Sequence, residues 1–155
     1  MPRIESVVAA VVISESTRVR GLRFEVDIVE MLRRVTNVIH RGGPGDGGID
    51  IICEISRVRF VIQCKNWVTT NIGRPIVDEL LGVLIRTQQP NGTIGIVVAP
   101  SMNNFTPGAI DAAIEIAELS TYPIIVTGKA QLPKYLLNAV LSELHNQSYT
   151  FVRLP

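Results

Sequence analysis

The chain has 155 residues, with 15 Lys and Arg against 14 Asp and Glu, and a formal net charge of +1. Hydrophobic residues make up 46% and charged residues 19% of the chain. This composition excludes an intrinsically disordered protein and suits one domain with a core of its own. The near-neutral total gives no sign of a polyanionic partner, so any basic surface must arise from clustering in space.

Cysteine usage and hydropathy exclude several further classes of protein. Cys53 and Cys64 are too few for a disulfide framework or a four-ligand zinc site, and the histidines His40 and His145 are distant in sequence. No apolar run reaches the roughly 18–20 residues that a membrane span needs. The apolar run at 7–13 is short and follows an acidic residue, so it is a poor secretory signal. We expect a soluble, intracellular protein with no membrane partner, and the cytoplasm, nucleus and mitochondrion all stay open as its compartment.

The apolar pattern predicts alternating strands and helices. In chain order, we expect a strand or entry segment at 7–13, a helix at 18–34, a strand at 35–39, a glycine-rich loop at 41–48, paired strands at 49–55 and 58–65, a helix from 74 that ends before 89–92, a buried strand at 93–99, a helix at 105–119, a strand at 123–127 and a helix at 129–144. Residues 149–154 are either an edge strand or a tail. This order predicts an α/β sandwich with a mixed central sheet.

The two paired strands form a hairpin if Ser56 and Arg57 are its loop residues. Directly opposed residues then have numbers with a constant sum. Asp50 is placed opposite Gln63, and Lys65 next to the glycine-rich loop. We therefore expect a carboxylate, a carboxamide and an ammonium group to converge at the end of the hairpin that is far from the turn.

The remaining residues of the hairpin suit structural roles. Glu54 is expected to face Arg59 near the turn, as a structural ion pair. Both cysteines are expected to be small buried hydrophobic residues, with no redox or metal-binding role. One face is predicted to be entirely apolar, and it consists of Ile49, Ile51, Cys53, Ile55, Val58, Phe60, Ile62 and Cys64.

The polar group at the hairpin end suits the hydrolysis of a phosphodiester. Gly45 and Gly47 leave open space and backbone N–H groups beside Asp50. A carboxylate together with amide or carbonyl oxygens suits Mg²⁺, and Lys65 could stabilise negative charge on phosphorus. The alternative is that Asp50 and Lys65 form an ordinary surface ion pair of little energetic weight.

Several of these segments resemble one nuclease family. They are Gly-Leu-Arg-Phe-Glu at 21–25, Gly-Gly-Pro-Gly-Asp-Gly-Gly-Ile-Asp at 42–50, Ile-Gln-Cys-Lys-Asn-Trp at 62–67, Val-Val-Ala-Pro at 97–100, Phe-Thr-Pro-Gly-Ala at 105–109 and Ile-Ile-Val-Thr-Gly at 124–128. Together they resemble the Mrr-like catalytic domain, a branch of the PD-(D/E)XK nucleases. The resemblance implies a three-layer α/β/α sandwich of the restriction-endonuclease type. It also implies a type IV-like, divalent-metal-dependent DNA endonuclease.

The resemblance also implies roles for individual residues. Asp50, Glu25 and the backbone carbonyl of Cys64 would bind Mg²⁺ or Mn²⁺. Lys65 would be the catalytic lysine. Gln63 occupies the position where most of the superfamily has Asp or Glu, which removes one negative charge from the site and makes Glu25 more necessary.

DNA is the implied partner. Contacts to its phosphates are expected from Arg41, Gly45 and Gly47 in the glycine-rich loop and from Arg74, because a helix N-terminus is itself an anion site.

Two other readings stay open, as does the domain organisation. The chain could be a catalytically inactive DNA-binding or interaction module, or a structure-selective nuclease like the junction resolvases. We divide it into an N-terminal extension at 1–16, an endonuclease domain at 17–145 and a C-terminal tail or edge strand at 146–155. A homodimer would allow both DNA strands to be cut, and nothing in the sequence indicates the DNA target.

Overall fold

The computed structural model describes residues 17–40, 49–66 and 71–146. The elements in chain order are α2 (Thr17–Arg33), β1 (Val38–His40), β2 (Ile51–Ile55), β3 (Val58–Cys64), α3 (Arg74–Arg86), β4 (Ile94–Ala99), the 3₁₀ turn η1 (Met102–Asn104), α4 (Pro107–Leu119), β5 (Ile124–Gly128), the 3₁₀ turn η2 (Lys129–Gln131) and α5 (Leu132–Asn146). The predicted segments at 7–13, 41–48 and 149–154 lie outside the described residues. In the part of the chain that is described, no helix is long and apolar enough to cross a membrane.

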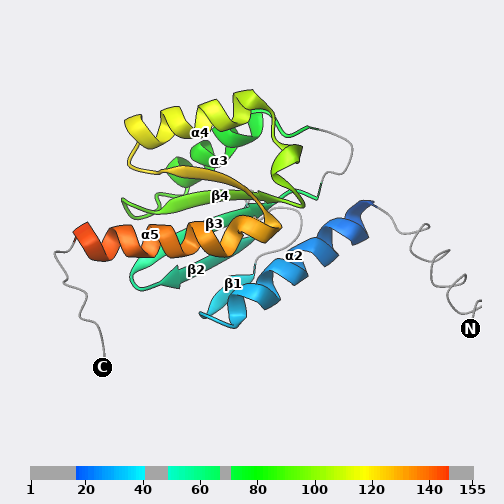
Figure 1. Cartoon of the computed structure of the whole chain (residues 1–155), viewed down its shortest axis with the longest axis horizontal. Helices are drawn as coiled ribbons and strands as arrows, with labels where there is room; N and C mark the ends of the chain where they lie inside the picture. Colours follow the sequence, from blue (N-terminus) through cyan, green and yellow to red (C-terminus); the bar gives the residue numbers. More distant parts are fainter. Residues whose placement is uncertain (1–16, 41–48, 67–70, 147–155) are drawn as a thin grey trace, which may run out of the picture.

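A five-stranded mixed sheet forms the middle layer. Its order is β1-β2-β3-β4-β5, antiparallel from β1 to β3 and parallel from β3 to β5. Helices α3 and α4 cover one face, and α2 and α5 lie on the other (Figure 1). Helices on both faces explain why β4 is apolar almost throughout, with every residue from Gly95 to Ala99 buried. The prediction of a three-layer α/β/α sandwich is confirmed.

Two separate apolar cores result, because neighbouring residues of a strand point to opposite faces. Ile52 and Val61 pack under α3 and α4. Cys53 and Phe60, one residue further along each strand, pack against α2 and α5 instead. Both faces of the hairpin are therefore buried over most of its length.

The β2–β3 hairpin turns at Ser56 and Arg57, as predicted. Both have positive φ angles, 48° and 72°, as in a type I′ turn, which suits the twist of the flanking strands. The register continues with Glu54 opposite Arg59. Arg59 Nη1 lies 3.1 Å from Glu54 Oε1, which confirms the predicted ion pair.

The predicted register is wrong at the other end of the hairpin. Regular pairing ends with Ile51 opposite Ile62, and the N–H of Asp50 donates to that same Ile62 carbonyl at 3.1 Å. This break in the alternation puts Ile49 in the core under α3 and α4, not on the face where strict alternation places it. Asp50 is therefore not in a regular pair with Gln63.

Local hydrogen bonds explain other boundary differences. The strand expected at 35–39 begins only at Val38, since the N–H groups of Val35 and Thr36 both donate to the Leu32 carbonyl and extend the end of α2. The helix expected from 105 begins at Pro107, where the Thr106 hydroxyl accepts from the Ala109 N–H at 3.2 Å. Residues 129–131 form η2 before α5.

Candidate active site

Asp50 lies one residue before β2 and is joined to the end of β3. Its Oδ2 accepts a hydrogen bond from the backbone N–H of Cys64 at 2.7 Å. The loss of regular pairing after Ile51 makes this contact available, because the side chain replaces a backbone acceptor. The carboxylate is thus fixed beside Gln63, Cys64 and Lys65, the sequence that ends β3.

Gln63 is the unusual residue of this group. It is only 4% exposed, and its Oε1 finds no hydrogen-bond partner among the described residues. It pairs in register with Val97 of β4 and shares a strand face with Val61, so it lies on the α3 and α4 side of the sheet. A buried amide oxygen with no partner costs free energy, and such a group in a native structure calls for an explanation.

Lys65 continues the line of β3 beyond the last regular pair. Its N–H donates to the Val98 carbonyl at 2.8 Å. Because β3, β4 and β5 run parallel, their carboxyl ends meet at this edge of the sheet. Ligands of open α/β sheets commonly bind outside such an edge.

Glu25 reaches the same region from α2. Burial raises the pKa of the Cys64 thiol well above its usual range, and the negative charges of Asp50 and then Glu25 raise it further. Both carboxylates therefore act electrostatically on one thiol at the end of β3. The structure brings Glu25 and Asp50 toward Cys64 from two separate elements.

The two cysteines behave largely as predicted. Cys53 is buried, and Cys64 packs against the same core while staying half-buried. Burial, followed by the charge of Glu54, raises the pKa of Cys53 to about 11. Thiolates are the reactive form of cysteine, so raised pKa values argue against redox or nucleophilic roles for both residues.

The oxygen atoms of this region suit a hard divalent cation better than a soft one. Among the described residues, no cluster of three or more His, Cys, Asp and Glu side chains could hold a metal ion by itself. A cation site here would need backbone and amide oxygens as well, which are common ligands of Mg²⁺ and Ca²⁺. The unpartnered Oε1 of Gln63 supplies such an oxygen, so the residues present fit the cation.

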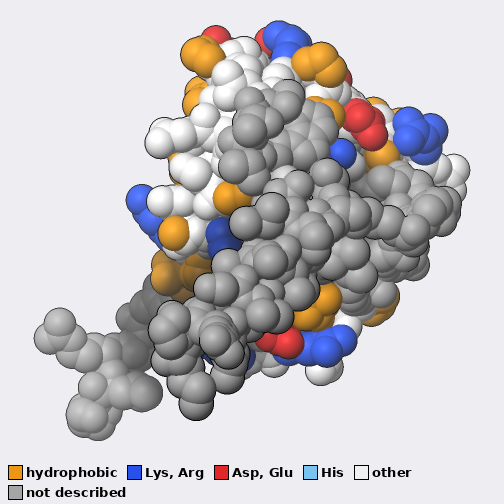
Figure 2. All heavy atoms as spheres, turned by 90° about the vertical axis from the view of Figure 1, so that its right-hand side faces the viewer, with side chains coloured by type: hydrophobic (Ala, Val, Ile, Leu, Met, Phe, Trp, Pro, Cys, Tyr) orange, Lys and Arg blue, Asp and Glu red, His pale blue; other side chains and the backbone are white. Residues whose placement is uncertain are grey.

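The expected phosphate contacts are less well defined. Arg41, Gly45 and Gly47 lie outside the described residues. Arg74 opens α3, but its guanidinium lies 3.5 Å from Asp78 and 3.3 Å from Glu115, so two acids already compensate its charge. On the face shown in Figure 2, some of the described Lys and Arg side chains lie beside Asp and Glu, and others lie among polar and hydrophobic side chains.

One ion pair near the site was not predicted from the sequence. Lys129 Nζ, in the first residue of η2, lies 3.7 Å from Asp27 Oδ2 of α2, two residues after Glu25. No spacing in the sequence indicates this pair, since 102 positions separate its members.

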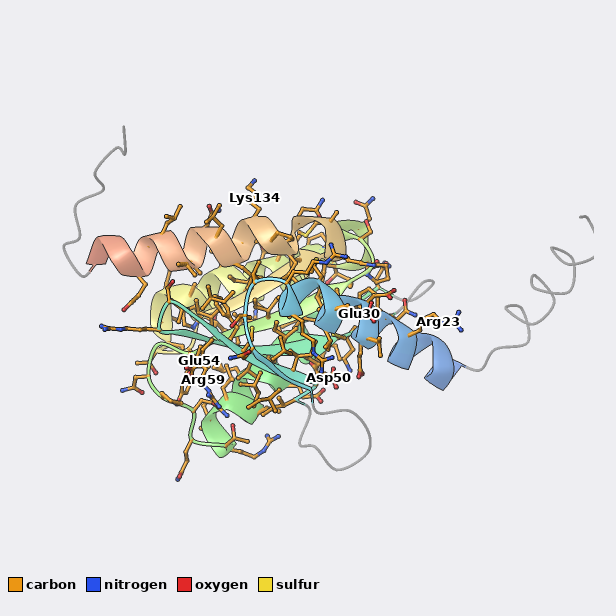
Figure 3. All side chains as sticks on the ribbon, turned by 90° about the horizontal axis from the view of Figure 1, so that it is seen from below. Arg23, Glu30, Asp50, Glu54, Arg59 and Lys134 are labelled. Atoms are coloured by element: carbon orange, nitrogen blue, oxygen red, sulfur yellow. The ribbon has the colours of Figure 1, made fainter. Side chains whose placement is uncertain are left out.

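Figure 3 shows Asp50 below the α2 helix, with Glu30 and Arg23 of α2 on the same side of the molecule.

Comparison with known proteins supports this assignment of the fold. The Mrr catalytic-domain family, described as restriction endonuclease, matches residues 17–130. No curated protein and no solved structure gave a significant match to the chain. The match covers most of the chain, including the end of the hairpin and α2. The chain therefore belongs to the Mrr catalytic-domain family, a nuclease family of the restriction endonuclease superfamily.

Proposed function

We propose that the chain is a divalent-metal-dependent endonuclease that hydrolyses phosphodiester bonds of DNA, in the manner of type IV restriction enzymes. One observation carries the proposal. The buried Oε1 of Gln63 has no partner among the described residues, and it lies one residue from the backbone that holds the Asp50 carboxylate. A role as an oxygen ligand for a cation would explain why an unpartnered amide oxygen is kept in a core.

In this proposal, Mg²⁺ or Mn²⁺ is held by Asp50, Glu25, the carbonyl of Cys64 and the amide oxygen of Gln63. An ionised carboxylate has about four acceptor positions, so the hydrogen bond from Cys64 to Asp50 does not exhaust its capacity. When bound, the ion supplies positive charge for the phosphate oxygens. The neutral Gln63 leaves two carboxylates for a doubly charged cation, which favours modest affinity.

Lys65 has the second role in the proposal. Its ammonium would stabilise the charge that develops on the phosphate oxygens and orient the attacking water. The N–H···O bond from Lys65 to Val98 anchors its backbone to β4. The side chain therefore starts from a fixed point at the carboxyl edge of the parallel strands.

The test is nicking of supercoiled plasmid with Mg²⁺ or Mn²⁺. We expect Asp50→Asn and Lys65→Ala each to lower the rate by at least about 100-fold. Lys134→Ala is the control for Lys65→Ala, because Lys134 is an exposed residue on the outer side of α5 (Figure 3). For Glu25→Gln the control is Glu30→Gln on the same helix. Equal nicking by parent, Asp50→Asn and Lys65→Ala would overturn the assignment.

A DNA-binding module without catalysis is the second candidate, and the neutral Gln63 favours it. Such a protein would bind duplex DNA with an affinity that falls steeply with salt, and would cut it with neither metal. Restoring a carboxylate with Gln63→Glu separates the two candidates. Cleavage gained only in Gln63→Glu would assign the binding role to the parent chain.

A further inference from the structure

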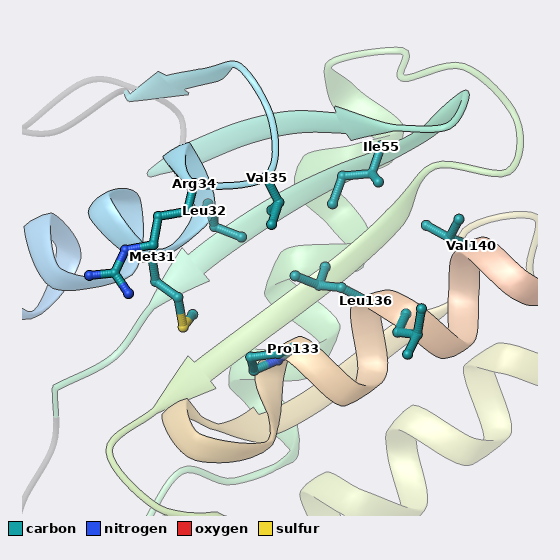
Figure 4. A pocket seen from close by; sticks show the side chains of 9 residues that line it. Met31, Leu32, Arg34, Val35, Ile55, Pro133, Leu136 and Val140 are labelled. Carbon is teal, nitrogen blue, oxygen red and sulfur yellow. The ribbon is translucent and has the colours of Figure 1, made fainter.

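An apolar groove lies between the C-terminal end of α2 and α5, on the face of the sheet opposite α3 and α4. Its cavity has a volume of about 290 Å³. Figure 4 shows Met31, Leu32 and Val35 on one side, α5 on the other and Ile55 at the end of β2. The lining residues are Met31, Leu32, Arg34, Val35, Ile55, Pro133, Leu136, Leu137 and Val140.

Several apolar side chains around this groove are much more exposed to solvent than the side chains of a hydrophobic core. Val35 is 68% exposed, Leu137 58% and Leu141 41%. Leu136 and Val140 form one apolar row of α5, which packs on the sheet. Leu137 and Leu141, each one residue further along, form a second row that none of the described elements covers. A contiguous exposed apolar surface of this kind marks an interaction site.

The size of the surface argues for a short segment as its occupant. Three partly exposed aliphatic side chains amount to a few hundred Å². A standard interface buries about 800 Å² on each partner. A second copy of the chain that used only this groove would fall well short of that area, whereas a few residues in extended conformation would match it.

The chain supplies a suitable segment directly after α5. Residues 147–155 read Gln-Ser-Tyr-Thr-Phe-Val-Arg-Leu-Pro, with four large apolar side chains and no acid. Asn146, the last residue of α5, lies six residues beyond Val140, roughly 9 Å along a helix at about 1.5 Å per residue. Nine extended residues span roughly 30 Å at about 3.3 Å each, so the segment can turn and reach back along α5.

We propose that residues 147–155 fold back over the groove and cover Val35 and Leu137 with their apolar side chains. The tether makes this contact intramolecular, with an effective concentration in the millimolar range. The segment would link α5 to the end of α2, the helix that carries Glu25. The proposal does not depend on nuclease activity.

Crosslinking in the full-length chain tests this inference. Tyr149, Phe151 and Leu154 are replaced by Cys one at a time, each together with Val35→Cys, and the rate of intramolecular disulfide formation is measured. The matched control is Ile114→Cys, at a residue that is 57% exposed on α4, across the sheet. We expect at least one Val35 pair to close ten-fold faster or more than its Ile114 counterpart.

A second measurement uses no cysteine. The equilibrium constant of unfolding is measured for Phe151→Ala, for Leu137→Ala and for the double variant. If the two side chains are in contact, the double variant should raise this constant by a smaller factor than the product of the two single factors. Equal crosslinking rates at Val35 and Ile114, or fully independent effects of the two alanines, would overturn the proposal. So would crosslinked dimers whose yield rises with protein concentration, because a second copy would then occupy the groove.

Discussion

Replacing Gln63 by leucine should stabilise the fold while it weakens metal binding. The side chain is 4% exposed and its Oε1 lacks a partner among the described residues. A buried polar group that makes no hydrogen bond costs about 1–3 kcal/mol. Leucine has a similar size and suits the surrounding core of Val61 and Val97. We expect Gln63→Leu to raise the free energy of unfolding by about 1–3 kcal/mol.

The assay is urea unfolding in EDTA, followed by the same titration with Mn²⁺. A gain of 1 kcal/mol corresponds to about 2–4 °C in melting temperature for a chain of this size. Thr127→Val is the matched control, because Thr127 is also buried but its hydroxyl donates to the Gly128 carbonyl at 2.9 Å. That variant should lose about 0.5–1.5 kcal/mol.

Metal addition supplies the functional half of this test. A ligand that binds only the folded state raises its stability according to ligand concentration and affinity. The parent should therefore gain stability from Mn²⁺, and Gln63→Leu should gain less. If Gln63→Leu is less stable than the parent in EDTA, or if both gain equally from Mn²⁺, the reasoning about the unpartnered oxygen is refuted.

Three further predictions concern the scaffold. Changing Ser56 to Asn and Arg57 to Gly, residues that suit positive φ, should raise the free energy of unfolding by about 1 kcal/mol; an unchanged denaturation midpoint would contradict this. Gly95→Ala should cost about 1–3 kcal/mol, because its Cβ would lie 2.7 Å from Ile124 Cδ1; a melting temperature equal to that of the parent would refute the packing argument. The pKa of Cys53 is raised to about 11 in the folded chain, whereas a free thiol has a pKa of about 8.5. The unfolded chain therefore loses this proton at lower pH, and the free energy of unfolding should fall as pH rises between these two values. Urea unfolding at pH 8 and pH 10.5 should show a smaller fall for Cys53→Val, and equal falls would count against the buried thiol.

The register of the hairpin shows how far the sequence could predict the site. The loop at Ser56 and Arg57 set the pairing, and the structure follows it up to Ile51 and Ile62. Beyond that point, the Asp50 carboxylate accepts a hydrogen bond from the Cys64 N–H. The prediction assumed that side chains alternate between the two faces along the whole strand. A side chain that replaces a backbone acceptor interrupts this alternation, so the face of Ile49 was predicted wrongly.

Contacts between distant elements could not be predicted in the same way. Arg74 of α3 lies 3.3 Å from Glu115 of α4, and no pattern in the sequence indicates that pair. The pair of Lys129 with Asp27 has no signature in either segment. Such pairs depend on how helices dock on the sheet, which local patterns do not encode.

Local periodicity and short motifs of fixed spacing were enough to predict the order of the described elements, the hairpin turn and the family. Charge and composition likewise excluded a disordered or disulfide-stapled chain at the outset. The burial of both hairpin faces, and the Gln63 oxygen that has no partner among the described residues, became visible only when the layers were packed together. The same packing leaves an apolar groove between α2 and α5. The physical reason is that burial and hydrogen-bond satisfaction depend on which elements pack together, and that is a property of the assembled layers.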